Sequence, residues 1–228
     1  MAQVNSLVDR SMEGRALSLP AVATALEVMM VLAGILLYIW RWQHTSPRAW
    51  VAIFAVILAS HVLHRDTLRG LGLGPTDFRA SAQWVLPLAI LMYVPMLSYG
   101  FALHRLALEE LTWRAPLLLV GYGIWCAFQQ YLAQSYFNNR LMSITQNRHL
   151  SSAVVGIMFS ATHIPNVILM VATLVGGVVF AEVFARYRSI WPLALAQAVG
   201  GLLLAAVSPD SLIHHMRVGP GYFFYGIR

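Results

Sequence analysis

The sequence has a single cysteine, no lysine and few charged residues of either sign. The lone Cys126 excludes a disulfide within one chain and any zinc site that needs paired cysteines. Charged residues make up 11% of the chain, whereas soluble domains carry about 25%. The formal net charge of +6 comes from arginines scattered between apolar segments, with no basic run. This distribution does not favour nucleic-acid binding and is typical of the loops of a membrane protein.

Apolar residues are what the chain has in excess, at 59% of the sequence and a mean hydropathy of +0.67. They form runs of about twenty residues, long enough to cross the hydrocarbon core of a bilayer. We predict an all-α polytopic membrane helix bundle of seven or eight transmembrane helices, folded as a single membrane domain over residues 1–228. The expected spans are residues 19–40, 49–63, 82–103, 115–136, 151–163, 167–185 and 190–207.

The segments outside these spans are polar or carry turn residues. Residues 1–18 are a polar N-terminal segment, residues 104–114 are predicted to form an interfacial helix, and residues 138–148 a polar loop. The C-terminal tail, residues 208–228, contains a Gly-Pro-Gly turn followed by aromatic residues. Such a tail suits a membrane interface or the surface of a protein partner, so we expect it to dock on one of them.

Polar side chains occur within these apolar spans, where they are costly unless they have a partner or a function. Gln129, Gln130 and Gln134 lie in the fourth expected span, and His163 ends the fifth. An amide keeps the shape of a carboxylate and one acceptor, but it cannot ionise. These glutamines therefore cannot act as general bases or supply charge to a metal ion.

Two acids also lie deep within expected spans. Glu182 and Arg186 are four residues apart, which predicts a local ion pair on one helix. Glu27 has no partner nearby in the sequence. An intramembrane carboxylate is a candidate functional group by default, so Glu27 is either part of a site or paired with an arginine of another span.

The order and spacing of motifs across residues 65–205 resemble the CPBP (CAAX protease and bacteriocin-processing, or Abi) family of intramembrane proteases. That family carries Glu-Glu-x-x-x-Arg, Phe-x-x-x-His and His-x-x-x-Asn on successive helices. Here the motifs fall on Gln129 to Gln134, on Phe159 to His163, and on Gln197 to Gly201, which follows Trp191-Pro192. The resemblance implies a CPBP-like helical core and an intramembrane endopeptidase ancestry.

Most positions that the resemblance marks as catalytic differ from the family pattern. The family motif positions are Gln129, Gln130, Gln134, His163, Gln197 and Gly201, and His163 alone keeps the family residue. The resemblance implies that the two glutamates, here amides, activate water and help to hold a metal. One neutral imidazole among amides makes a poor metal site. We therefore assign no catalytic residue and predict no cofactor and no metal, with His163 as the sole candidate metal ligand.

Two interpretations of the polar residues stay open. In the first, the glutamines and His163 form one hydrogen-bonded cluster that satisfies buried groups and fixes helix register. In the second, they line a neutral pocket that binds a lipid, isoprenoid or pigment. The pocket candidates are Gln129, Gln130, Phe159, His163, Gln197 and Glu27.

We interpret the chain as a proteolytically inactive, CPBP-like integral membrane protein of the bacterial inner membrane. It is expected to act as a binding or accessory subunit, with the bilayer and, through the tail, protein subunits as partners. One alternative is an active intramembrane protease with an altered site, in which His163 is the base and glutamines donate to an oxyanion. The other is a histidine–metal oxidoreductase that uses His61, His64, His163, His214 and His215.

Overall fold

The computed structural model describes residues 19–75, 77–103 and 115–224, and every element within these ranges is helical. In chain order the elements are α2 (Leu19–Leu37), η1 (Tyr38–Trp42), α3 (Gln43–Thr45), α4 (Ala49–Leu63), α5 (Phe78–Ala102), α6 (Ala115–Gln130), η2 (Tyr131–Asn138), α7 (Asn139–Thr145), α8 (Arg148–Ala161), α9 (Val167–Arg186), α10 (Trp191–Val207), α11 (Asp210–Ile213), η3 (His214–Met216) and α12 (Pro220–Phe223). The all-α prediction is confirmed for this part of the chain. The polar segment 1–18 and the interfacial helix predicted at 104–114 lie outside the described residues.

Three helical stretches within the described ranges are long and apolar enough to cross a membrane: Pro20–Thr45, Phe78–Ala102 and Val167–Arg186. Helices α4 and α10 are apolar but shorter. Large apolar side chains cover the outside of the bundle, for example Met30, Leu86 and Leu91, which are 66%, 62% and 71% exposed. A surface of this kind belongs in lipid. The structure thus supports a helical membrane protein, but it does not confirm seven or eight crossings.

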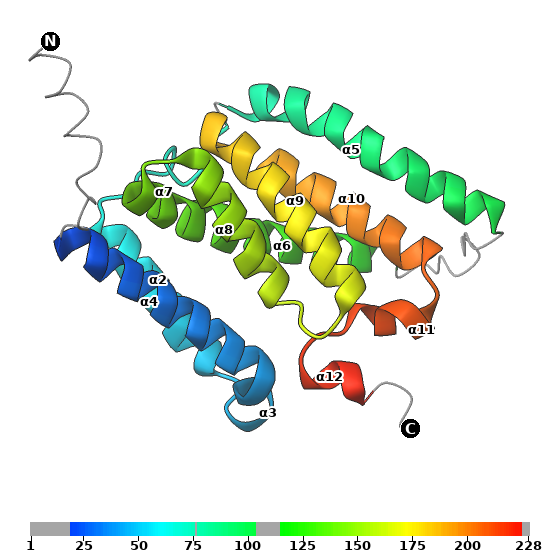
Figure 1. Ribbon diagram of the computed structural model, residues 1–228, viewed down its shortest axis with the longest axis horizontal. Helices are drawn as coiled ribbons and strands as arrows, with labels where there is room; N and C mark the ends of the chain where they lie inside the picture. The colour runs from blue at the N-terminus through cyan, green and yellow to red at the C-terminus, as the bar shows by residue number, and fades with distance from the viewer. Residues whose placement is uncertain (1–18, 76, 104–114, 225–228) are drawn as a thin grey trace, which may run out of the picture.

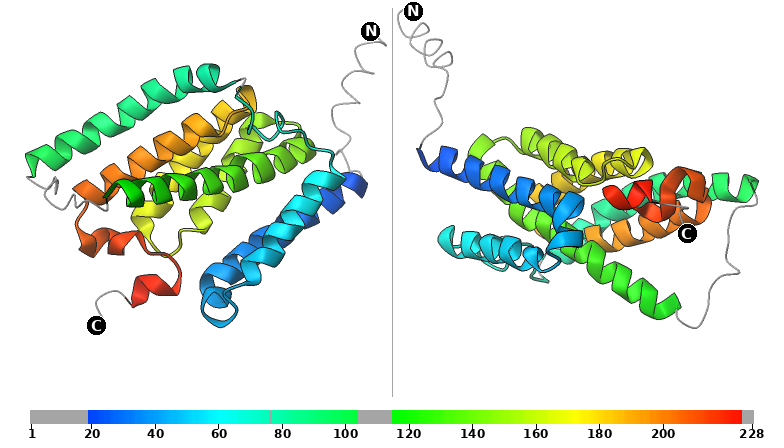
Figure 2. Two further views of the ribbon diagram at one scale, coloured as in Figure 1. Left: turned by 180° about the vertical axis from the view of Figure 1, so that it is seen from behind. Right: turned by 90° about the horizontal axis from the view of Figure 1, so that it is seen from below.

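The helices form one bundle with a hairpin at one edge (Figure 1). Helices α2 and α4 make this hairpin, and α5 lies at the opposite edge beside α10. Helices α8 and α9 pack against each other between these edges. The long stretch that begins with α6 runs behind them in Figure 1 and is seen in front in the left view of Figure 2.

A continuous helical stretch runs from α6 through η2 to the end of α7 at Thr145. The predicted polar loop at residues 138–148 is therefore wrong up to Thr145. Asn138 and Arg140 are 0% and 3% exposed, so the polar composition here reflects buried hydrogen bonding rather than contact with water. The turn comes at Gln146, whose φ is 51°, and the Asn147 side chain then caps the first turn of α8.

Helices α8 and α9 approach most closely through glycines. A Cβ atom placed on Gly177 would lie 3.0 Å from the Cα of Gly156, so neither position has room for a side chain. Glycine lets two helix backbones approach in this way, which suits packing in a membrane, where apolar side chains gain little by leaving lipid.

The tail folds back onto the turn between α8 and α9. The Asn166 side-chain amide donates to the carbonyls of Ile213 and Arg217, at 2.7 Å and 3.2 Å. The backbone N–H of Gly219 donates to the carbonyl of Ile164 at 2.8 Å. The tail therefore docks on its own chain.

Candidate functional site

Four glutamines from the predicted motifs form a chain of hydrogen bonds, in which the amide nitrogen of one residue donates to the amide oxygen of the next. The amide nitrogen of Gln197 on α10 donates to Gln129 Oε1 on α6. Gln130 Nε2 donates back to Gln197 Oε1 at 2.6 Å, and Gln134 Nε2 donates to Gln130 Oε1 at 3.2 Å. The expected polar cluster thus forms between the glutamines, and it ties α10 to α6.

The chain of amides continues into the next helix. Asn138 Nδ2 donates to Gln134 Oε1 at 3.2 Å, and Ser151 Oγ of α8 donates to Asn138 Oδ1 at 2.7 Å. Gln130, Gln134 and Asn138 are each 0% exposed. Gln130 is the last residue of α6, and Gln134 and Asn138 lie in the π-helix η2, a type of segment that often marks a functional position. Each amide both donates and accepts, which a carboxylate at the same position could not do.

The asparagine position of the third motif is blocked. A Cβ on Gly201 would overlap the hydroxyl of Tyr122 from α6. The tyrosine ring therefore occupies the space that the asparagine side chain needs. Glycine at 201 and tyrosine at 122 are therefore complementary, and a phenol hydroxyl stands where the family's asparagine amide would lie.

A cavity of about 750 Å³ opens beside the glutamines. Helices α2, α4, α6 and α8 contribute its wall, together with η1, η2 and Val218 of the tail. Among the residues described, no charged side chain lines the cavity, and most of its wall is aliphatic or aromatic. Its polar members are Tyr38, Gln43, Gln129, Thr162 and His163. Such a wall suits a large, uncharged and mainly apolar ligand.

The cavity takes in only some of the predicted pocket residues. Gln129, Phe159 and His163 line it. Gln130 and Gln197 are hydrogen-bonded to each other in the amide chain and are not among the described lining residues of the cavity. Glu27 faces a different set of partners, which corrects the expectation that it shares this pocket.

His163 stands apart from the glutamines. Its Nδ1 lies 2.8 Å from the carbonyl oxygen of Phe159, one turn earlier in the chain. A carbonyl can only accept, so Nδ1 carries the proton and the neutral ring keeps Nε2 as an acceptor. No hydrogen bond within the described part of the chain joins His163 to Gln129. The single cluster expected from the sequence is therefore wrong for His163.

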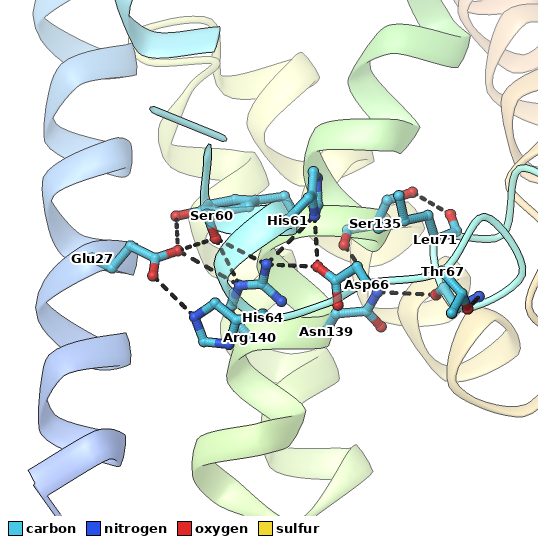
Figure 3. Close-up of polar contacts among 12 residues, drawn as sticks. Glu27, Ser60, His61, His64, Asp66, Thr67, Leu71, Ser135, Asn139 and Arg140 are labelled. Carbon is cyan, nitrogen blue, oxygen red and sulfur yellow. Dashed lines mark hydrogen bonds and ion pairs between the residues drawn. The ribbon is translucent and has the colours of Figure 1, made fainter. Parts of the chain in front are cut away.

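Arg140 of α7 is buried at the centre of a group of charged and hydroxyl side chains (Figure 3). Its Nη2 lies 2.6 Å from Asp66 Oδ2, and its Nε lies 3.5 Å from Glu27 Oε1. Ser60 Oγ accepts from the guanidinium and donates to Glu27 at 2.5 Å, and the Tyr136 hydroxyl donates to Glu27 at 2.8 Å. Glu27 thus has an arginine partner from another helix, one of the two outcomes expected for it.

Two histidines complete this cluster. His61 Nδ1 lies 2.7 Å from Asp66 Oδ2, and His64 Nε2 lies 3.2 Å from Glu27 Oε2. Burial alone would raise the pKa of Asp66, but hydrogen bonds from Arg140 and His61 outweigh burial and hold that pKa below its usual value. Asp66 and Arg140 were not singled out from the sequence. They sit in segments that read as polar loops, so nothing in the local pattern indicated burial.

Glu182 also has other partners than expected. Its Oε1 lies 2.8 Å from His149 Nδ1, and its Oε2 lies 3.6 Å from Arg148 Nε, both at the start of α8. The predicted local pair with Arg186 does not form. Arg186 instead lies over the ring of Trp84, with 6.0 Å between the guanidinium carbon and the ring centre.

The histidines do not gather into a metal centre in the structure. Among the residues described, no three His, Cys, Asp or Glu side chains lie close enough to hold a metal ion together. His61 and His64 are engaged by carboxylates, and His163 lies in the cavity wall. This arrangement does not support the histidine–metal oxidoreductase alternative.

A comparison with models of known protein families identifies the family of this chain. Residues 80–203, more than half of the chain, match the model of the type II CAAX prenyl endopeptidase Rce1-like family. The chain belongs to this family. The resemblance identified from the three motifs is therefore confirmed. The comparisons with curated proteins and with solved structures give no match.

The side chains at the Rce1-like motif positions do not fit a divalent metal ion. Gln129 and Gln130 are uncharged, and each of their Oε1 atoms already accepts a hydrogen bond. His163 offers one nitrogen. Metal sites in proteins use several nitrogen, sulfur or carboxylate ligands, so this Rce1-like site has too few donors.

Proposed function

We propose that this Rce1-like protein is a proteolytically inactive binding protein that holds an uncharged isoprenoid or lipid in the cavity beside His163. The cavity carries the proposal. It has about 750 Å³ of space, its wall carries no charged group in the part of the chain that the structure describes, and Gln129 and His163 are among its few polar groups. The cavity is within the size range of ligand sites that bury most of a ligand.

Hydrolysis is disfavoured by what surrounds His163. A histidine that acts as a base is normally oriented by a group that stabilises the imidazolium, most often a carboxylate. His163 Nδ1 is bonded to a backbone carbonyl, and the nearby motif positions carry amides. The altered-site protease would have to form a cation on a half-buried ring that no described carboxylate contacts, which is costly.

The polar groups in the wall define the head group of the ligand. Gln129 Oε1 accepts from Gln197, which leaves the Gln129 amide hydrogens as donors, and His163 Nε2 is an acceptor. A hydroxyl group can accept from the first and donate to the second. A phosphate or diphosphate would find no cation to pair with among the described residues of this wall. The ligand that fits is therefore a long-chain alcohol, such as a prenol.

The proposed role in the cell, beyond ligand binding, follows from the same membrane helix bundle. We place the protein in the bacterial inner membrane as an accessory subunit, with α4, α6, α8 and α10 completing a seven-span arrangement around the three long spans. The exposed Phe223 and Phe224, at 59% and 63%, offer an apolar surface on the tail for a protein partner. Recovery of such a partner in stoichiometric amount from native membranes tests this role.

The cavity proposal is tested with purified protein in mild detergent. Geranylgeraniol and geranylgeranyl diphosphate are titrated separately and read by native mass spectrometry. The alcohol is expected to bind and the diphosphate to bind at least tenfold more weakly. His163→Phe and Gln129→Leu each remove one polar group and are expected to weaken alcohol binding roughly tenfold, as for a lost buried hydrogen bond.

The same samples are assayed for cleavage of a farnesylated CAAX peptide. We expect no cleavage above the background of a mock purification. Cleavage that disappears in His163→Phe would overturn the inactive assignment in favour of the altered-site protease. Preferential binding of the diphosphate would instead overturn the uncharged ligand.

A further inference from the structure

A second hollow lies on the outer surface of the bundle, between α5 and α9 at the start of α8. Its volume is about 270 Å³. Leu88 of α5 and Val178 and Val183 of α9 give it an apolar part, which we call its floor, and Arg148 and Arg186 also line it. None of its described lining residues lines the large cavity.

The hollow lies where helices enter and leave the membrane. Helices α5 and α9 are both long enough to span a bilayer, and Arg186 is the last residue of α9. Arg148 is the first residue of α8. Trp84, near the start of α5, is stacked on Tyr187, with 6.4 Å between ring centres and 21° between ring planes. Tryptophan and tyrosine mark the headgroup level of a membrane, so the arginines lie at that level and the apolar floor faces the acyl chains.

The charges in this hollow favour an anion. Glu182 is already held by His149 through Oε1 and by Arg148 through Oε2. Both described contacts of the Arg148 guanidinium run through Nε, which leaves its two terminal nitrogens as donors. Within the described ranges, no carboxylate lies at ion-pair distance from Arg186. Two arginines against one carboxylate give a formal excess of one positive charge.

We propose that this hollow is a binding site for an anionic phospholipid, with the phosphate at Arg148 and Arg186 and an acyl chain along the apolar floor. Arginine binds phosphate through paired hydrogen bonds, and basic pockets between transmembrane helices recognise lipid head groups. Leu88 and Val178 of its lining belong to the membrane-spanning stretches of α5 and α9, where lipid tails pack, and a free phosphate ion would not use them. This site is independent of the ligand proposed for the large cavity.

The test is native mass spectrometry of the full chain in detergent, with phosphatidylglycerol and phosphatidylcholine of identical acyl chains. The wild type is expected to retain phosphatidylglycerol in preference to phosphatidylcholine. Arg148→Gln and Arg186→Gln are each expected to weaken phosphatidylglycerol binding roughly fivefold and leave phosphatidylcholine unchanged. Glu182→Gln removes the opposing charge and is expected to strengthen phosphatidylglycerol binding.

Arg48→Gln is the matched control, because Arg48 is an exposed arginine that does not line this hollow. Equal retention of the two lipids by the wild type, or an equal loss in Arg48→Gln, would overturn the proposal. Competition by glycerol 3-phosphate at the same concentration as the lipid would show that the phosphate alone is recognised, which also overturns it. Circular dichroism of each variant separates lost binding from lost folding.

Discussion

Arg140 and Asp66 are joined by a 2.6 Å contact between Nη2 and Oδ2, and the arginine side chain is 3% exposed. The pair fastens the helical stretch that carries the first Rce1-like motif to the segment after α4. On its other side the same guanidinium faces Glu27 of α2. One buried cation thus holds together the α2–α4 hairpin and the core, the two parts between which the large cavity opens.

Removing this cation is expected to be costly. Arg140→Gln leaves two carboxylates beside a neutral group, so we expect a loss of about 3–5 kcal/mol in unfolding free energy. Arg69→Gln is the control, because Arg69 is 73% exposed and 3.7 Å from Asp77, and surface pairs contribute about 0–1 kcal/mol. Denaturant unfolding followed by circular dichroism measures both variants. Equal effects would show that the buried network adds nothing beyond a surface pair.

The same pair gives the protein an acid-sensitive component of stability. The pKa of Asp66 is lower when folded than when unfolded, so its contribution is complete above the unfolded value of about 4 and is lost as pH falls through the lowered value. We expect the melting temperature of the wild type to fall more steeply between pH 5 and about pH 3 than that of Asp66→Asn. Parallel pH profiles would contradict a titrating Asp66.

The sequence was sufficient for the elements whose signal is local. The apolar run of α4 gives the observed bounds, Ala49–Leu63, because a polar turn flanks it on each side. The motif spacing predicted which glutamines meet, because the family resemblance implies that the motif positions of successive helices face one common site. Gln129, Gln130, Gln134 and Gln197 are accordingly joined.

Features that depend on distant partners could not be predicted. Arg140 reads as a loop residue because its carboxylate partners lie 74 and 113 positions away in the chain. In the sequence, Gly201 is only a position where the family has asparagine. The fold shows that the Tyr122 hydroxyl occupies the space of the missing side chain. One of the two open interpretations joined His163 to the glutamines, but its ring nitrogen Nδ1 instead lies 2.8 Å from the carbonyl oxygen of Phe159, near the end of α8.

The direction of the amide chain can be tested by breaking it in the middle. Gln130→Leu leaves both Gln134 Nε2 and Gln197 Oε1 without a partner, and each unsatisfied buried group costs about 1–3 kcal/mol. Gln129 is the end of the amide chain that lines the cavity, and Gln129→Leu leaves only Gln197 Nε2 without its acceptor. We expect the unfolding free energy to fall about twice as far in the first variant. The reverse order would mean that the chain is satisfied by other groups.

The contact between α8 and α9 depends on one glycine of each helix. A Cβ on Gly156 would lie 2.9 Å from the Leu174 carbonyl oxygen, so Gly156→Ala must separate the two helices. We expect a loss of about 1–3 kcal/mol, as for other overpacked sites. Gly176→Ala has open space in the described structure and should be neutral or slightly stabilising. Thermal unfolding of the two variants in one detergent distinguishes close packing from a general effect of glycine replacement.

The large cavity can be filled without disturbing the fold. Gly121 and Gly123 both lie in α6, and in the described structure no heavy atom comes within 4 Å of a Cβ placed on either. Gly121 lines the cavity and Gly123 does not. Gly121→Leu puts a branched side chain into the ligand space, so we expect at least a tenfold loss of geranylgeraniol binding. Replacing either glycine by leucine should stabilise helix α6 by up to about 1 kcal/mol, because leucine has the higher helix propensity. Gly123→Leu is therefore a control matched in stability. If Gly121→Leu binds the alcohol as well as Gly123→Leu does, the alcohol occupies some place other than this cavity.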